Sequence, residues 1–349
     1  MTESMTTTGI AHRIRRSILI CYMPILWSLV SLFFLSWTAQ TVVAKSTDPR
    51  AAVTSSKTSP KKVQKKHLQK KSKPVSQGVQ AKAFYCVNPV NNETLLARNP
   101  DQSLPVASLT KLVTALVVLD HMALDRKVTV PDHVKTVPRS VVGLKPGDSV
   151  TVEDLLHGLL IGSGNDCAET LACTFPGGKS KFVEFMNKKV RRLGNTRTLF
   201  YTPSGLDRKT ACEPEGPKTE DVDTNVSTAR EMAQIARVAF SNKTIRTICL
   251  KKSHVIGSNI NKNGYYVRTT NKLLRDNLPL VGGKTGFTAR AGHCLASEFK
   301  PGRDVFLIVV LGSPDHFRDT RLVYRTALKK TKSTKNVYPT IDSKKVAAN

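Results

Sequence analysis

The sequence predicts a mixed α/β protein in which one sheet joins the two ends of the folded part. Two strand-like segments open that part, a block of helical segments follows, and three more strand-like segments and a last helix close it. The 349 residues are 40% hydrophobic, which is enough for one sizeable core or two modest ones. We therefore expect a single mixed sheet with helices packed around it.

The opening strands are expected at 83–87 and 94–98, on either side of the turn-like Asn91-Asn92. The first helical segment after them is apolar on nearly all sides, which is typical of a helix buried in a core. Helices are expected, in chain order, at 109–122, 151–161, 166–173, 179–193 and 227–240.

The closing strands are expected at 280–287, 293–299 and 304–311. Pro301-Gly302 lies between the last two and indicates a hairpin. A final helix is expected at 315–330, with no further C-terminal domain after it.

The formal net charge of +28 is concentrated near the two ends of the chain. Residues 45–82 hold eleven lysines and arginines against one acid, Asp48, and 329–345 is also rich in lysine. This distribution predicts basic arms on a folded body rather than a basic binding face. Segment 45–82 has too few apolar residues to fold, so we interpret it as a disordered linker. No aromatic residues alternate with its lysines, so we expect an anionic membrane or wall surface as its partner and no nucleic acid.

An export segment is predicted at 1–44. Arg13, Arg15 and Arg16 precede the uncharged run 18–37, and small residues allow cleavage after Ala44. The run is also long enough to span a bilayer, so a removed signal peptide and a retained anchor both stay open. The arginines keep the N-terminal end in the cytoplasm, and the remainder is expected outside. The chain then divides into this segment, the linker 45–82, a catalytic domain 83–330 and a basic tail 331–349.

The cysteines and histidines do not predict a metal site. None of the seven cysteines forms a CxxC pair, and the eight histidines form no cluster with ligand spacing. We therefore expect no metal and no cofactor, and the pairing of the cysteines stays open.

The first string with chemical meaning is Ser108-Leu109-Thr110-Lys111, at the start of the long apolar helix. The same S-x-x-K spacing occurs at Ser59 and Ser297, but in the lysine-rich linker and in a strand. On a helix, residues three apart share a face, which places the Lys111 amine near the Ser108 hydroxyl. A buried lysine loses its charge readily and can then accept the serine proton. Read alone, Ser108 is better explained as a helix cap.

Two further strings complete a set. Ser163-Gly164-Asn165 lies in the turn between two expected helices, and offers a hydroxyl to pass a proton and an amide to hold a substrate backbone. Lys284-Thr285-Gly286 follows two glycines on an expected strand. A substrate lying antiparallel to this strand gains main-chain hydrogen bonds, and Lys284 and Thr285 can then bind its terminal carboxylate. Each string alone has an ordinary structural explanation, as a turn and as an edge strand.

In this order, the three strings match the motif set of serine penicillin-binding proteins and class A β-lactamases. From 83 to 330 the chain resembles the low-molecular-mass penicillin-binding proteins that act as D,D-carboxypeptidases. The resemblance extends to Pro105-Val106-Ala107, Gly143-Leu144-Lys145-Pro146-Gly147, Asp154-Leu155-Leu156, Gly162-Ser163-Gly164-Asn165-Asp166, Ser204-Gly205-Leu206-Asp207, Ser227-Thr228-Ala229-Arg230, Lys284-Thr285-Gly286-Phe287-Thr288 and Ala291-Gly292-His293-Cys294.

The resemblance implies an antiparallel central sheet with flanking helices and a helical subdomain, as in β-lactamases and transpeptidases. It implies that Ser108, helped by Lys111, attacks the bond between two D-alanines of a peptidoglycan stem peptide, and that Ser163 protonates the leaving amine. The backbone amides of Ser108 and Phe287 would form the oxyanion hole, and Asn165, Lys284, Thr285 and Gly286 would bind substrate. β-Lactam antibiotics would acylate Ser108. The work would take place in the periplasm or at the extracytoplasmic face of the bacterial inner membrane.

The chain departs from relatives at three points. Gly283 stands where many carry a bulkier residue, and Thr270 stands where some carry a substrate-binding arginine. The C-terminal β-domain and amphipathic anchor helix of many relatives are not expected here, and an N-terminal anchor would take over the membrane role.

Three other functions were weighed. A D,D-endopeptidase that cuts cross-links fits the same motifs and stays open. A class A β-lactamase requires a deacylating glutamate, but Glu184 comes too early and the region near Phe200 has none. A non-catalytic module that binds the wall or lipid is disfavoured because all three motifs are intact.

Overall fold

The computed structural model describes residues 78–209 and 222–337, which belong to one unit of the chain, Gln69–Asn349. The predicted export segment with its cleavage position, most of the predicted linker and the end of the basic tail lie outside the described residues. No helix within the described ranges is long and apolar enough to cross a membrane. Five cysteines, all in the described part, are free: Cys86, Cys167, Cys173, Cys249 and Cys294.

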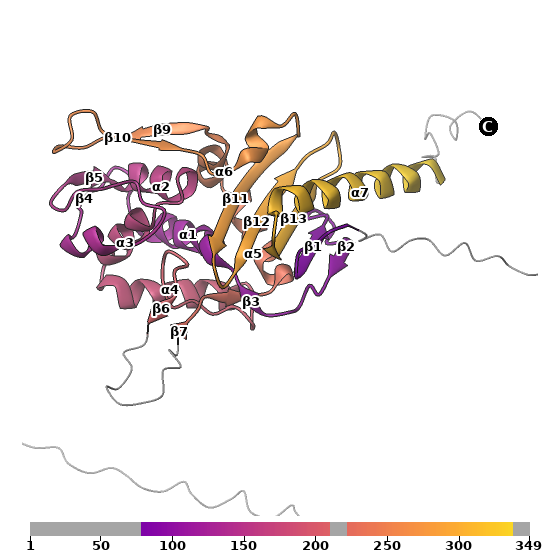
Figure 1. Ribbon diagram of the computed structural model, residues 1–349, viewed down its shortest axis with the longest axis horizontal. Coiled ribbons are helices and arrows are strands. Elements are labelled where there is room, and N and C mark those ends of the chain that lie inside the picture. The colour runs from indigo at the N-terminus through magenta and orange to yellow at the C-terminus, as the bar shows by residue number, and fades with distance from the viewer. Residues whose placement is uncertain (1–77, 210–221, 338–349) are drawn as a thin grey trace, which may run out of the picture. The chain divides into compact units, whose positions relative to one another are not determined.

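One five-stranded sheet, antiparallel throughout, forms the centre of the fold (Figure 1). Its order is β11-β12-β13-β1-β2. The strands are β1 (Ala83–Val87), β2 (Thr94–Arg98), β11 (Leu280–Thr288), β12 (Gly292–Phe299) and β13 (Phe306–Ser313). Because β1 pairs with β13, the first and last strands are neighbours, which confirms the predicted joining of the two ends.

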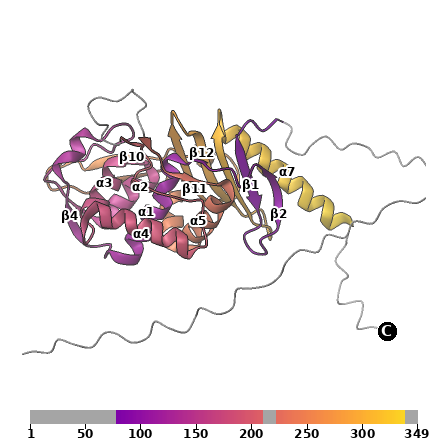
Figure 2. The ribbon, with the colours of Figure 1, turned by 90° about the horizontal axis from the view of Figure 1, so that it is seen from below.

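Successive residues of the inner strands point into two separate cores, one on each face of the sheet. In β1, Ala83 and Tyr85 enter the larger core, whereas Phe84 and Cys86 enter the smaller one. Helix α5 (Ala229–Ser241) packs on the first face, and α7 (His316–Val337) on the second (Figure 2). Burial on both faces explains why β13 is an unbroken apolar run in the sequence.

A group of helices lies beside β11, at the end of the sheet that carries the predicted site (Figure 1). Helix α1 runs through it and is buried over most of its length. The members of the group are α1 (Lys111–His121), α2 (Val152–Ile161), α3 (Asn165–Cys173) and α4 (Gly178–Arg192). This group and the antiparallel sheet confirm the expected fold class.

Several elements differ from the prediction. The segment around Ser108 is a 3-10 turn, η1 (Ala107–Thr110), and the α-helix begins only at Lys111. Helix α7 runs beyond the expected end at 330, because the lysine-rich sequence after it has no helix breaker before Pro339. The elements not predicted are α6 (Lys243–Leu250), β9 (Ser253–Ile256) with β10 (Tyr265–Arg268), the short pairs β3 (Leu104–Pro105) with β8 (Val226–Ser227), β4 (Lys127–Thr129) with β5 (Ser149–Thr151) and β6 (Arg208–Lys209) with β7 (Val222–Asp223), and the turns η2 (Asp132–Thr136) and η3 (Lys272–Arg275).

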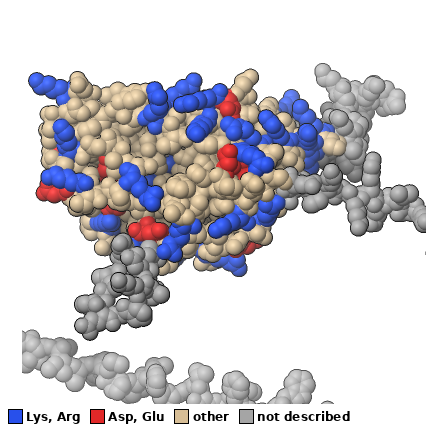
Figure 3. All heavy atoms as spheres, in the orientation of Figure 1, with Lys and Arg blue, Asp and Glu red and all other residues tan. Residues whose placement is uncertain are grey.

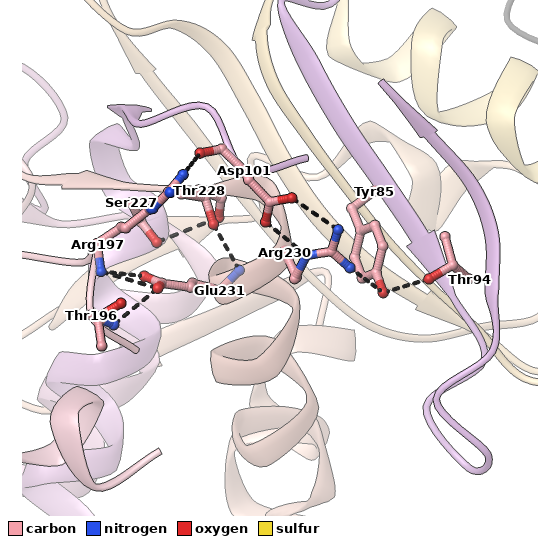
Figure 4. A network of polar contacts seen from close by, with 9 residues as sticks. All are labelled: Tyr85, Thr94, Asp101, Thr196, Arg197, Ser227, Thr228, Arg230 and Glu231. Atoms are coloured by element: carbon pink, nitrogen blue, oxygen red, sulfur yellow. Dashed lines mark hydrogen bonds and ion pairs between the residues drawn. The ribbon is translucent and has the colours of Figure 1, made fainter. Parts of the chain in front are cut away.

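A polar network fixes the start of α5 against the sheet (Figure 4). Thr228 caps the helix by accepting a hydrogen bond from the Glu231 backbone N–H at 3.0 Å. Arg230 donates to both carboxylate oxygens of Asp101, at 2.7 and 3.0 Å, and to the Tyr85 hydroxyl at 3.1 Å. The network therefore ties α5 to β1 and to the segment that leads toward Ser108.

Candidate active site

Ser108 and Lys111 face one another as the i, i+3 spacing predicts. Lys111 Nζ lies 3.0 Å from Ser108 Oγ, 2.8 Å from Asn165 Oδ1 and 2.5 Å from the Ser204 carbonyl oxygen. The Lys111 side chain is fully buried, and burial, together with the charge of Lys284, lowers its pKa well below the usual 10.5. A neutral amine has two N–H groups and one lone pair. The two oxygens take the N–H groups, which leaves the lone pair for the serine proton.

Ser163 and Lys284 form a second pair of serine and lysine. Ser163 adopts a left-handed backbone conformation, with φ of 59°, between α2 and α3. Lys284 Nζ donates to Ser163 Oγ and to the Thr285 carbonyl oxygen, both at 2.8 Å. Burial lowers the pKa of Lys284 to about 7. The Lys284 amine is therefore directed at Ser163, and its predicted role in binding a substrate carboxylate stays a prediction.

Asn165 is the first residue of α3 and connects three parts of the site. Its Oδ1 accepts from Lys111, its Nδ2 donates to the Pro138 carbonyl oxygen at 3.0 Å, and its backbone N–H donates to the Ser140 carbonyl oxygen at 2.8 Å. The amide predicted to hold a substrate backbone thus already contacts Lys111 and the 138–140 loop.

Gly286 lets β11 approach the nucleophile closely. A Cβ on Gly286 would lie 2.9 Å from the Ser108 backbone nitrogen and 3.2 Å from that of Leu109, distances too short for a side chain. Phe287 follows it and is half exposed. This approach favours the predicted oxyanion hole between the backbone amides of Ser108 and Phe287.

Glycine is required at Gly282 and Gly283, just before the K-T-G string, for a different reason than at Gly286. A Cβ on Gly282 would lie 2.7 Å from the Phe240 ring, and one on Gly283 would lie 2.5 Å from Asn271 Nδ2. At both positions a side chain, and not another part of the backbone, occupies the space that a Cβ would need. The close approach of a second backbone occurs instead at Gly286.

A cavity of about 220 Å³ opens over this site. Of the predicted site residues, Ser108, Ser163, Asn165, Thr285, Gly286 and Phe287 line it. Lys111 and Lys284 are buried and contact its two serines. The structure thus brings all eight predicted residues together.

Other residues of the cavity carried no motif signal. Arg139 is exposed and has a left-handed φ of 66°. His316 also lines the cavity, and both ring nitrogens lack a hydrogen-bond partner among the described residues. Burial, and then the charge of His293, lower the pKa of His316 to about 4, so the ring is neutral at pH 7. Thr270 Oγ1 lies 2.5 Å from Thr285 Oγ1.

Lys and Arg side chains are spread over the face of the molecule shown in Figure 3, with Asp and Glu among them.

None of the side chains that line the cavity belongs to either of the two groups of potential metal ligands in the described part of the chain. A serine next to a buried lysine whose pKa is lowered offers nucleophilic attack.

The sequence profile of the D-alanyl-D-alanine carboxypeptidase family, peptidase family S11, matches residues 68–315. A D-alanyl-D-alanine endopeptidase of Pseudomonas aeruginosa is 30% identical over 315 residues, which cover 85% of this chain and 86% of that protein. The carboxypeptidase DacF of Bacillus subtilis is 30% identical over 241 residues, which are 67% of this chain but only 58% of DacF.

Solved structures agree with the sequence comparisons. A D-alanyl-D-alanine carboxypeptidase of Mycobacterium tuberculosis superposes with a TM-score of 0.64 at 29% identity, covering 72% of this chain and 91% of that one. A Streptomyces DD-transpeptidase gives 0.63 at 29% identity, covering 72% and 98%. The match over most of the chain, and the serine–lysine site described above, show that this protein belongs to the D-alanyl-D-alanine carboxypeptidase family of serine peptidases.

Proposed function

We propose that this protein removes the terminal D-alanine from peptidoglycan stem pentapeptides through an acyl-enzyme on Ser108. The observation that carries the proposal is the Lys111 amine, 3.0 Å from Ser108 Oγ, with its other neighbours both acceptors. As Ser108 Oγ attacks the carbonyl carbon between the two D-alanines, its proton passes to Lys111.

The leaving D-alanine requires a proton on its nitrogen as the C–N bond breaks. Ser163 supplies it from its hydroxyl and regains a proton from Lys284, whose amine donates to Ser163 Oγ at 2.8 Å. Water then attacks the acyl-enzyme carbonyl, and its proton passes through Ser163 to Lys284. As the bond to Ser108 Oγ breaks and the shortened peptide leaves, the proton held by Lys111 returns to Ser108. Penicillin, which resembles the acyl-D-Ala-D-Ala end, acylates the same serine.

The test is a substitution at the nucleophile. We expect Ser108→Ala to abolish both labelling by a fluorescent penicillin and release of D-alanine, because no other hydroxyl lies beside Lys111 Nζ among the described residues. Far-UV circular dichroism and Tm should stay unchanged. Ser297→Ala is the matched control, because Ser297 has the same spacing to Lys300 but lies in β12, where its hydroxyl has no partner within the described residues. Labelling of Ser108→Ala would overturn the proposal.

A second candidate is D,D-endopeptidase activity on cross-linked stem peptides. The Pseudomonas relative named endopeptidase matches over 85% of this chain, and the motifs are shared by both activities. Mass spectrometry of the products from a pentapeptide muropeptide and from a cross-linked dimer separates the two. Loss of D-alanine from the monomer alone identifies a carboxypeptidase, and conversion of dimer to monomers identifies an endopeptidase.

The place of action follows from the substrate. The protein acts on the extracytoplasmic side of the inner membrane, exported by the segment 1–44, and the basic linker holds it near anionic wall polymers or lipid headgroups. Binding of the full chain and of a chain without 45–77 to isolated walls tests the linker. Equal binding would remove that role.

A further inference from the structure

Three side chains of the metal-binding kind meet at the C-terminal end of α3, outside the catalytic cavity. They are His133 of η2 and Glu169 and Cys173 of α3, and their ligand atoms all lie within 4.8 Å of one another. Glu169 and Cys173 share a face of the helix because they are four residues apart. Cys173 Sγ lies 3.6 Å from His133 Nε2. Sequence spacing could not indicate this group, because His133 is distant in the chain.

The distances suit a tetrahedral zinc ion. Zinc bonds of about 2.0–2.3 Å place neighbouring ligand atoms roughly 3.4–3.7 Å apart. The separation of Cys173 Sγ and His133 Nε2 is already of this size. The ligand atoms of the two pairs that include Glu169 must approach each other by no more than about 1.3 Å. Rotation of side chains can supply this movement, since His133 is exposed and Cys173 is half-buried.

The charge of Glu169 also favours a cation. Its side chain is buried, and its Oε2 accepts no hydrogen bond within the described residues. The Lys179 amine lies 2.6 Å from this oxygen, so the two form an ion pair, although not with hydrogen-bond geometry. The Lys179 side chain is 43% exposed and can turn into solvent. A dication bound directly to the carboxylate would therefore replace a partner that is free to leave.

We propose that His133, Glu169 and Cys173 form a binding site for Zn²⁺, with water as the fourth ligand. Thiolate, imidazole and carboxylate are the ligands of zinc, whereas a cysteine is a poor ligand for magnesium or calcium. On binding, the Cys173 thiol releases its proton to solvent, and the ion forms a bond to the thiolate sulfur.

The second group of potential ligands is Asp154, His157 and His254. Both nitrogens of His157 are already engaged, with the Glu153 carbonyl oxygen at 2.9 Å and the Lys251 amine at 2.8 Å. We therefore do not propose a metal site here, and use a variant of this group as a control in the zinc experiment.

The zinc site would stabilise one wall of the catalytic cavity. η2 leads directly into the 138–140 loop, whose carbonyl oxygens accept two hydrogen bonds from Asn165 at the first turn of α3. The ion would connect η2 to the last turn of the same helix. Together, the two connections would hold the loop at both ends of α3.

The experiment is a titration of the full chain with Co²⁺, followed by competition with Zn²⁺. We expect a thiolate-to-cobalt absorption band that saturates at one equivalent and disappears when Zn²⁺ is added. Cys173→Ser should remove the band, and His133→Ala should weaken Zn²⁺ binding at least about tenfold. Lys179→Met should tighten binding, because it removes the ammonium that competes for Glu169.

His254→Ala should leave the band unchanged. Labelling by fluorescent penicillin should persist in every variant, which separates this test from that of the proposed function. A band that survives in Cys173→Ser, no band in the wild-type chain, or unchanged affinity in Lys179→Met would each overturn the proposal.

Discussion

Ser108 and Ser163 each contact a buried lysine, and the charge of one lysine affects the pKa of the other. The charge of Lys284 is one cause of the lowered pKa of Lys111, second only to burial. Protonation of Lys284, whose pKa is about 7, therefore favours the loss of a proton from Lys111. A positive charge on one lysine thus favours the neutral form of the other.

This coupling predicts a pH effect. The rate of acylation by penicillin should fall on acidification, as Lys111 becomes protonated at a pH well below 10.5. Lys284→Met removes a neighbouring positive charge, so the pKa of Lys111 should rise and the acid limb of the profile should move to higher pH. Acylation rates measured across a range of pH give the midpoint of the acid limb even when a variant has a lower maximal rate. Lys179→Met, at the surface, is the control and should leave the acid limb at the same pH.

Gly286 allows a second prediction. We expect Gly286→Ala to slow acylation by at least about 100-fold, because the new Cβ forces β11 away from the Ser108 backbone and misplaces the oxyanion donors. Stopped-flow acylation measures the loss. Gly257→Ala is the control, since a Cβ there meets only Asp154 Oδ2, at 3.5 Å. Equal rates for the two variants would contradict the role given to Gly286.

The site residues predicted from the sequence are those that belong to short motif strings. Ser108, Lys111 and Lys284 belong to strings in which spacing has a direct geometric meaning. The Ser204 carbonyl oxygen, which orients Lys111, could not be found in this way, because every residue has a carbonyl. Arg139 and His316 were missed because single side chains far apart in the chain form no pattern.

At the scale of elements, long segments with clear periodicity were predicted well, and β1 and β2 were predicted to the residue. The two-residue and three-residue strands were missed, because so few residues show no alternation. The 3-10 turn at Ser108 was missed because its sequence is compatible with either helix type. That difference matters chemically, since Ser108 makes no cap and its hydroxyl stays available to Lys111.

The cap of α5 gives a prediction at this scale. Thr228→Ala removes the acceptor of the Glu231 N–H, and should lower the free energy of unfolding by about 1 kcal/mol. Urea denaturation measures it. Ser241→Ala, at the other end of the helix, removes only a bond to the Val238 carbonyl oxygen at an exposed position and should have a smaller effect. A larger loss at Ser241 would contradict the importance of the cap.

For the whole molecule, the segment just before β1 is part of the folded body. Val79 and Ala81 are buried in the core beneath α7, and the Gln80 N–H donates to the Asp319 carboxylate at 3.0 Å. Composition had assigned these residues to the linker because lysines and polar residues surround them. Their role depends on contacts with α7, far away in the chain.

Two truncations test whether the segment just before β1 contributes to stability. Removal of 45–77 should leave Tm unchanged, whereas removal of 45–82 should cost about 2 kcal/mol or more through lost burial of Val79 and Ala81. Thermal unfolding of both truncated forms measures the difference in Tm. The same Tm for both would show that these contacts contribute nothing.

The pairing of β1 with β13 has a consequence for how the protein is made. β1 leaves the ribosome early, but its neighbour on one side is synthesised only after nearly all the other elements. Pairing across so long a sequence distance is slow. The five-stranded sheet is therefore still open while most of the chain is being made. The cavity beside Ser108 is also completed late, because Thr285, Gly286 and Phe287 on β11 line it and follow most of the other elements in the sequence.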